Sequence, residues 1–88
     1  MLRLTRTAET PAEVVLKAEG QIVADWVGVL EEEVLQLAAR DTQIVLDLGE
    51  VSYLDSRAVR LIRTLATGPV SLVNCSPLVE ELLAEDVP

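Results

Sequence analysis

The chain has 88 residues, of which 15 are Asp or Glu, 7 are Lys or Arg and none is His, so its formal charge is −8. This acidic balance without a basic tract argues strongly against nucleic acid or an anionic membrane as the main partner. The absence of His and the single Cys75 exclude His–Cys metal sites, histidine general bases and a disulfide framework. We therefore expect neither a metal nor a cofactor.

A chain of this length supports one domain, which we expect to span residues 1–88. Half of the residues are apolar, but Trp26 and Tyr53 are the only aromatic ones, so the core is expected to be aliphatic. These two aromatics are either core residues or anchors for a partner. The first residues lack the apolar stretch of a signal peptide and no segment is long enough for a membrane span, so we expect a cytoplasmic protein without membrane insertion.

Two strands are predicted at the beginning of the chain. Residues 2–6 alternate apolar and polar, which is typical of a half-exposed edge strand, and residues 7–12 form a turn or short loop. Residues 13–19 read as a second strand, which Gly20 ends or bends. The short connection predicts an antiparallel hairpin.

A helix is predicted over residues 25–40, because the hydrophobic period changes there to three and four. Asp25 is expected to cap its beginning, and Arg40 suits its C-terminal dipole. The Glu residues at 31–33 are expected on the solvated side. The predicted inner face consists of Val27, Leu30, Val34, Leu37 and Ala38.

Residues 43–48 form a short β-branched apolar run, typical of a central parallel strand. Gly49 is predicted to end it, and residues 50–54 to form a connection to a second helix over 56–67. The inner side of that helix is predicted to carry Val59, Ile62, Leu65 and Ala66.

The last elements are a strand over residues 70–75 and a helix over 77–84, separated from the second helix by Gly68 and Pro69. The resulting order β-β-α-β-α-β-α predicts an α/β fold. We expect a four-stranded mixed sheet with an N-terminal antiparallel hairpin and about three helices, joined by right-handed crossovers.

Ser56 is the strongest candidate for a functional residue. It is predicted at the beginning of a helix, beyond the carboxyl end of a parallel strand, where binding sites of such sheets gather. Free backbone N–H groups at that position would stabilise an anion, including a phosphate on the hydroxyl. The alternative is that Ser56 is a plain N-cap, because Ser and Asp are preferred capping residues.

A basic stretch begins at the same residue. Residues 56–79 contain Arg57, Arg60 and Arg63 and no acid, so their formal charge is +3. Spacing of three places the arginines on one side of the helix. This pattern indicates either an ordinary solvated face or a contact strip for a phosphate or an acidic partner.

Three segments resemble the STAS domain, a family that includes bacterial anti-sigma-factor antagonists. Residues 44–56 are similar to its signature, a hydrophobic strand followed by Asp-Leu-x-x-Val, an aromatic, an aliphatic residue and Asp-Ser. Residues 16–22 resemble its strand ending in Gly-x-Leu or Gly-x-Ile. Residues 74–79 resemble its late strand followed by Ser-Pro and a helix.

The resemblance implies that Ser56 is a phosphoacceptor and that the adjacent Asp55 orients it or caps the helix. In sigma-regulating members a kinase that is also the anti-sigma factor phosphorylates this serine, and phosphorylation breaks the complex. Together with the basic stretch and the aromatic residues, this gives Asp25, Tyr53, Asp55, Arg57 and Arg60 as the expected partner-binding residues. Two positions depart from the family pattern: Arg57 stands where Ser or Thr is common, and Ala58 replaces the usual Gly. The Ala58 methyl could obstruct the approach of a kinase loop.

Three functions are therefore considered. The first is a non-catalytic module that regulates transcription by binding an anti-sigma kinase, switched by phosphorylation of Ser56. The second is a STAS subunit that docks on the ATPase of a lipid-type ABC transporter, or a STAS scaffold that is not phosphorylated. An enzyme is the weakest, because a serine nucleophile needs a base and the chain has no His and only one Lys, Lys17.

Overall fold

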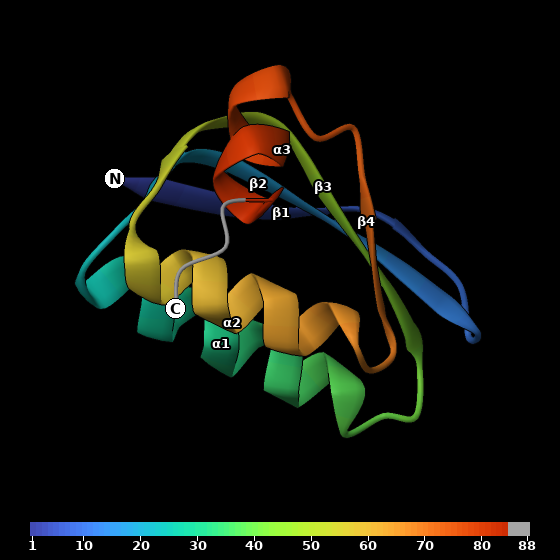
Figure 1. The fold of residues 1–88 in the computed structure, drawn as a ribbon. Helices are drawn as coiled ribbons and strands as arrows, with labels where there is room; N and C mark the ends of the chain where they lie inside the picture. Colours follow the sequence, from blue (N-terminus) through green and yellow to red (C-terminus); the bar gives the residue numbers. More distant parts are fainter. Residues whose placement is uncertain (85–88) are drawn as a thin grey trace.

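A computed structural model describes residues 1–84 of the chain as one sheet with three helices (Figure 1). The sheet has the order β1-β2-β3-β4, with β1 and β2 antiparallel and the other neighbours parallel. This confirms the predicted fold class and element order. The last four residues of the expected domain, 85–88, lie outside the described residues. The elements are β1 (Leu2–Glu9), β2 (Glu13–Ile22), α1 (Asp25–Ala38), β3 (Gln43–Leu54), α2 (Ser56–Ala66), β4 (Val70–Val73) and α3 (Pro77–Ala84).

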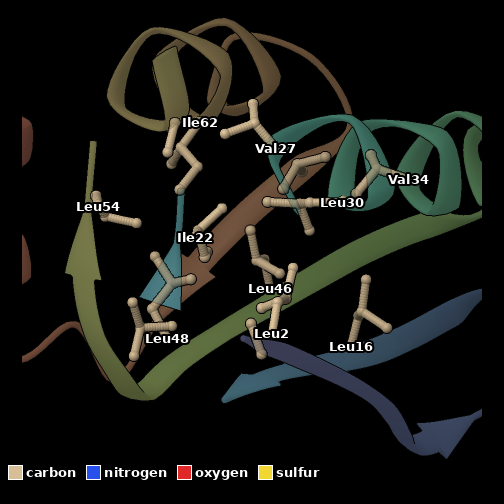
Figure 2. Packing of buried hydrophobic residues seen from close by; sticks show 14 of the residues in the cluster. Leu2, Leu16, Ile22, Val27, Leu30, Val34, Leu46, Leu48, Leu54 and Ile62 are labelled. Atoms are coloured by element: carbon tan, nitrogen blue, oxygen red, sulfur yellow. The ribbon is translucent and has the colours of Figure 1, made fainter. Parts of the chain in front are cut away.

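Helices α1 and α2 lie side by side on one face of the sheet (Figure 1), and α3 packs against β3 and α2. The strands turn every second side chain toward these helices, as Val14, Leu16 and Ala18 of β2 illustrate. In Figure 2, Leu30 of α1 and Ile62 of α2 point into the same cluster as the strand residues. All buried hydrophobic residues of the described chain are Leu, Val, Ile or Ala, as expected from the composition.

Strand β3 is longer than predicted, because Gly49 does not end it. Lys17 pairs with Asp47 and Glu19 with Glu50, so β3 holds one extra residue there, which is a β-bulge. Beyond the bulge the strand bends toward α2 (Figure 1) and continues to Leu54. The expected connection over residues 50–54 is therefore paired strand, and only one residue separates β3 from α2.

The N-terminal hairpin is also longer than predicted. Strand β1 continues to Glu9, so the loop expected over 7–12 is confined to residues 10–12. Strand β2 passes through Gly20, which adopts a φ of +99°. A Cβ at this position would lie 2.3 Å from the Met1 carbonyl oxygen, so both the backbone conformation and the space require glycine.

Helix α1 buries Val27, Leu30, Val34 and Leu37, as its period predicts, but its ends differ from the prediction. Asp25 is the first helical residue rather than the cap, and the capping position is held by Ala24 without a side-chain hydrogen bond. The helix ends at Ala38, so Arg40 lies beyond its last turn and forms an ion pair with Glu9 at 3.5 Å.

Smaller differences concern the second half of the chain. Helix α2 ends at Ala66, which is exposed rather than on the inner side, and β4 ends at Val73. Helix α3 has the predicted bounds. None of the helices within residues 1–84 combines the length and apolarity needed to cross a bilayer.

Candidate functional site

The candidate site lies where β2 and β3 end and where α1 and α2 begin. The two strands are neighbours, and their last residues, Ile22 and Leu54, pair. The backbone N–H of Asp55 donates to the Ile22 carbonyl at 3.2 Å, which extends this pairing by one residue. The beginnings of both helices are thereby fixed against each other at one edge of the sheet.

The carboxylate of Asp55 joins the two helix beginnings. Its Oδ1 accepts the Ala58 N–H at 2.8 Å and so caps α2, while its Oδ2 accepts the Ala24 N–H at 2.8 Å in front of α1. Asp55 itself has extended backbone, as expected for an N-cap. This confirms that Asp55 is the capping residue, a role that the sequence left open between orientation of Ser56 and capping.

Ala24 has an unusual conformation, with φ 52° and ψ −126°. It is the first central residue of a turn closed by the Trp26 N–H and the Val23 carbonyl at 3.0 Å. These angles match the first central position of a type II′ turn, which strongly favours glycine. The hydrogen bond from the Ala24 N–H to Asp55 therefore holds a strained alanine in place.

Opposing effects act on the pKa of Asp55. Partial burial raises it, but the hydrogen bonds from Ala24 and Ala58 and the nearby charge of Arg57 lower it. The net result is a pKa below the ordinary value of 3.8, so the carboxylate is ionised at neutral pH.

Ser56 is the first residue of α2, not its cap, so the plain N-cap interpretation is wrong. Its side chain is exposed, and no group within residues 1–84 forms a hydrogen bond with its hydroxyl. The hydroxyl is therefore open to solvent and to a partner at a position that Asp55 holds fixed.

The arginines of α2 divide into two kinds. Arg57 and Arg60 are exposed, and no carboxylate of the described chain lies within 4.0 Å of either guanidinium. Arg63 is half-buried and donates from Nε to the Leu83 carbonyl at 2.8 Å, with a second bond from Nη2 to the same oxygen. The expected strip of three arginines thus has two exposed members, and the third ties α2 to α3.

A surface groove between α1 and α2 places these arginines opposite an acidic residue. Arg57 and Arg60 form one wall and Glu31 of α1 stands on the other. The remaining lining residues are Val27, Leu61 and Thr64. The groove thus combines the apolar Val27 and Leu61 with opposite charges on its two helices.

Both aromatic side chains lie near this edge and are on the surface. Tyr53 is 45% exposed and pairs with Gln21, one residue before the last pair between β2 and β3. Trp26 is 38% exposed in the first turn of α1, next to the exposed Asp25. The structure therefore places Asp25, Tyr53 and Asp55 at the same edge as Ser56.

Two further expectations concern single side chains. Ala58 is fully buried, so its methyl faces the core and cannot obstruct a partner, which corrects the expected steric effect. Cys75 is partly buried; this burial and then the charge of Glu80 raise its pKa. Among residues 1–84, no group of three acidic or Cys side chains is arranged to hold a metal ion.

The comparisons with known proteins agree with this architecture. The unphosphorylated form of the anti-sigma factor antagonist SpoIIAA is similar in structure, with a TM-score of 0.73 and 17% sequence identity over 91% of this chain and 80% of that chain. No curated protein shows significant similarity in sequence. A family model described as Mlab, STAS domain, matches residues 5–85. The match covers nearly the whole sequence, and the chain therefore belongs to the STAS domain family.

Proposed function

We propose that this STAS domain is a non-catalytic regulatory module that binds a protein partner through the edge around Ser56. The observation that carries the proposal is the Ser56 hydroxyl, which is exposed, free of internal hydrogen bonds and fixed directly after the capping Asp55. A modification there changes the surface without disturbing the core. The proposed setting is the cytoplasm, with neither nucleic acid nor membrane insertion involved.

The distribution of aromatic residues supports protein binding at this edge. Trp and Tyr are enriched among residues that dominate interface energies. The chain has one of each, and both Trp26 and Tyr53 are exposed near Ser56 although the core is aliphatic throughout. The proposed contact surface comprises Asp25, Tyr53, Asp55, Arg57 and Arg60.

The proposed partner is a serine kinase that also acts as an anti-sigma factor. In the switching step the Ser56 Oγ forms a bond to the γ-phosphorus of ATP, the bond to the bridging oxygen breaks and ADP leaves. The hydroxyl proton passes to a base of the kinase. The new phosphate adds close to two negative charges at neutral pH, which weakens the complex. The likeness in fold to SpoIIAA supports this assignment, because that protein is an anti-sigma factor antagonist with an unphosphorylated form.

A role for Ser56 as the nucleophile of an enzyme has little support. A nucleophilic serine needs a base within hydrogen-bond reach. Lys17 is in the middle of β2, where it pairs with Asp47, whereas Ser56 follows the far ends of β2 and β3. We therefore propose that the chain has no catalytic residue of its own.

The alternative is docking on the ATPase of a lipid-type ABC transporter, or a scaffold role without phosphorylation. It is favoured by the groove between α1 and α2, since a helical face that offers apolar side chains such as Val27 and Leu61 suits a constitutive contact. It is favoured also by Arg57, which stands where the family commonly has Ser or Thr. This alternative needs no modification of Ser56.

The direct test incubates the protein with its cognate kinase and ATP and measures intact mass. We expect one added phosphate in the wild type and none in Ser56→Ala. A phosphate that persists in Ser56→Ala, or no phosphate in either protein, would contradict the switch and leave the scaffold or ATPase alternative.

The second test compares binding of wild type and Ser56→Asp to the same kinase in a pull-down with a titrated partner. The added carboxylate is expected to weaken binding by about tenfold, through repulsion and the desolvation of an extra charge. The matched control is Ser71→Asp, which adds the same charge at an exposed serine of β4 that pairs with Val45, near the other end of β3, and is expected to bind like the wild type. Equal affinity of all three proteins would count against the switch.

A further inference from the structure

Some arginines of the described chain bind an acceptor within the protein, and others do not. Arg6 donates to Glu33 at 2.9 Å and Arg40 pairs with Glu9 at 3.5 Å, while Arg63 binds the Leu83 carbonyl. Arg3, Arg57 and Arg60 have no such acceptor among residues 1–84, although acids outnumber bases about two to one in the chain. A cation left unpaired in so acidic a protein is available for an anion that is not always present.

The helix places Arg60 beside Ser56. Residues four apart on a helix lie on the same face, with Cβ atoms about 5–6 Å apart. Both side chains are exposed, so the flexible arginine stem can bring its guanidinium over the serine hydroxyl. Arg57 is the next residue along the chain but is turned by about 100° around the helix, and it lies close to Asp55.

The beginning of α2 offers a phosphate fewer free donors than an uncapped helix beginning would. The Ala58 N–H, which would otherwise be free in the first turn, is already held by Asp55 Oδ1 at 2.8 Å. The Asp55 carboxylate also brings a negative charge next to Ser56. A nearby side-chain cation would therefore stabilise a phosphate on Ser56, because it offsets the repulsion between the phosphate and the Asp55 carboxylate.

We propose that Arg60 is the built-in counter-ion of a phosphate on Ser56: its guanidinium binds the phosphate within the same helix face. The inference rests on the proposed phosphorylation of Ser56 and adds how the modified state is stabilised. Capture of the phosphate also withdraws Arg60 from the contact surface. Phosphorylation thus changes two charges of that surface, the added phosphate and the engaged arginine.

The test uses the folded protein with phosphoserine introduced at position 56 during translation, so no kinase is needed. The second pKa of the phosphate, near 6, is followed by 31P NMR titration. Arg60 stabilises the dianion, so Arg60→Gln is expected to raise the titration midpoint by about 0.3 pH unit at low salt. The difference is expected to fade in 1 M NaCl, because an exposed pair is screened there.

The matched controls are Arg57→Gln and Arg40→Gln, which remove the same charge. Arg57→Gln is expected to shift the midpoint less than Arg60→Gln, and Arg40→Gln, beyond the other end of α1, is expected to shift it by less than about 0.1 unit. A midpoint unchanged in Arg60→Gln, or a larger shift in Arg57→Gln, would overturn the assignment. The variants change exposed side chains, and amide spectra confirm that each protein is folded before titration.

The phosphoserine titration and the kinase experiment test the two proposals independently. A protein that no kinase modifies can still show the Arg60 effect once phosphoserine is present, and the proposed function would then fail alone. Phosphorylation by the kinase together with an unchanged midpoint in Arg60→Gln would retain the switch and remove the counter-ion.

Discussion

Helices α1 and α2 begin at the same edge of the sheet, but their first turns are held in different ways. Helix α2 has a local cap, because Asp55 accepts the N–H of a residue only three positions later. Helix α1 has no cap of its own, and the residue before it, Ala24, depends on the same Asp55, 31 positions away in sequence. One carboxylate therefore organises two helices, so the surface around Ser56 and the beginning of α1 are coupled.

Removal of Asp55 is the strongest way to break this coupling. Asp55→Ala removes a helix cap and leaves the Ala24 N–H without its acceptor, so we expect the free energy of unfolding to fall by about 2 kcal/mol. Urea denaturation measures this loss. Hydrogen exchange should show faster exchange at the beginnings of both helices, and a loss confined to α2 would contradict the shared role.

A smaller effect of opposite sign is expected at Ala24. Ala24→Gly places glycine in a turn position that favours it, and the relief of strain is expected to raise the free energy of unfolding by about 1 kcal/mol. The matched control is Ala39→Gly, past the end of α1, where φ is −64° and no such relief exists. A destabilised Ala24→Gly protein would show that Ala24 is not strained.

The pH dependence of the free energy of unfolding tests how much the charge of Asp55 contributes. Its pKa is lowered on folding, so its contribution to stability is complete above the unfolded value near 3.8 and is lost as the pH falls through the folded value. Asp55→Asn keeps an acceptor for the Ala58 N–H but loses the charge and one carboxylate oxygen. The stability difference between wild type and Asp55→Asn is therefore expected to be constant above pH 5 and to shrink below about pH 4. If this stability difference instead grew as the pH falls, the pKa of Asp55 would have to be raised on folding, contrary to the structure.

The smallest effect is expected at the neighbouring residue. The Ser56 hydroxyl has no hydrogen bond within the described chain, so Ser56→Ala should change the free energy of unfolding by less than about 0.5 kcal/mol. Thermal or urea unfolding measures this. A loss as large as that of Asp55→Ala would mean that Ser56 has a structural role, contrary to the structure.

The element order was predictable because each helix and strand carries its own hydrophobic period. The end of β3 was not, because Gly49 and Glu50 interrupt that period while the strand continues through a bulge. Pairing with β2 holds this second half, which is a tertiary effect that local sequence does not carry. Local patterns therefore located the elements but not the full length of the longest strand.

The position of the candidate site was predictable from a local pattern as well. An Asp-Ser pair before an amphipathic helix indicates a helix beginning, but the pattern alone does not decide whether Asp55 or Ser56 is the cap. Ala24 carries no sequence signal at all, since its turn position favours glycine and its stabilising partner is distant. The same holds for Arg63, whose acceptor belongs to α3.

The exposed indole of Trp26 makes the strained turn observable. Its backbone N–H closes that turn, and it is the only tryptophan of the chain. A partner that covers this edge transfers the indole out of water, and opening of the turn moves it further into water. The wavelength of the intrinsic Trp26 emission therefore shifts in one direction when a partner binds and in the opposite direction when the turn opens.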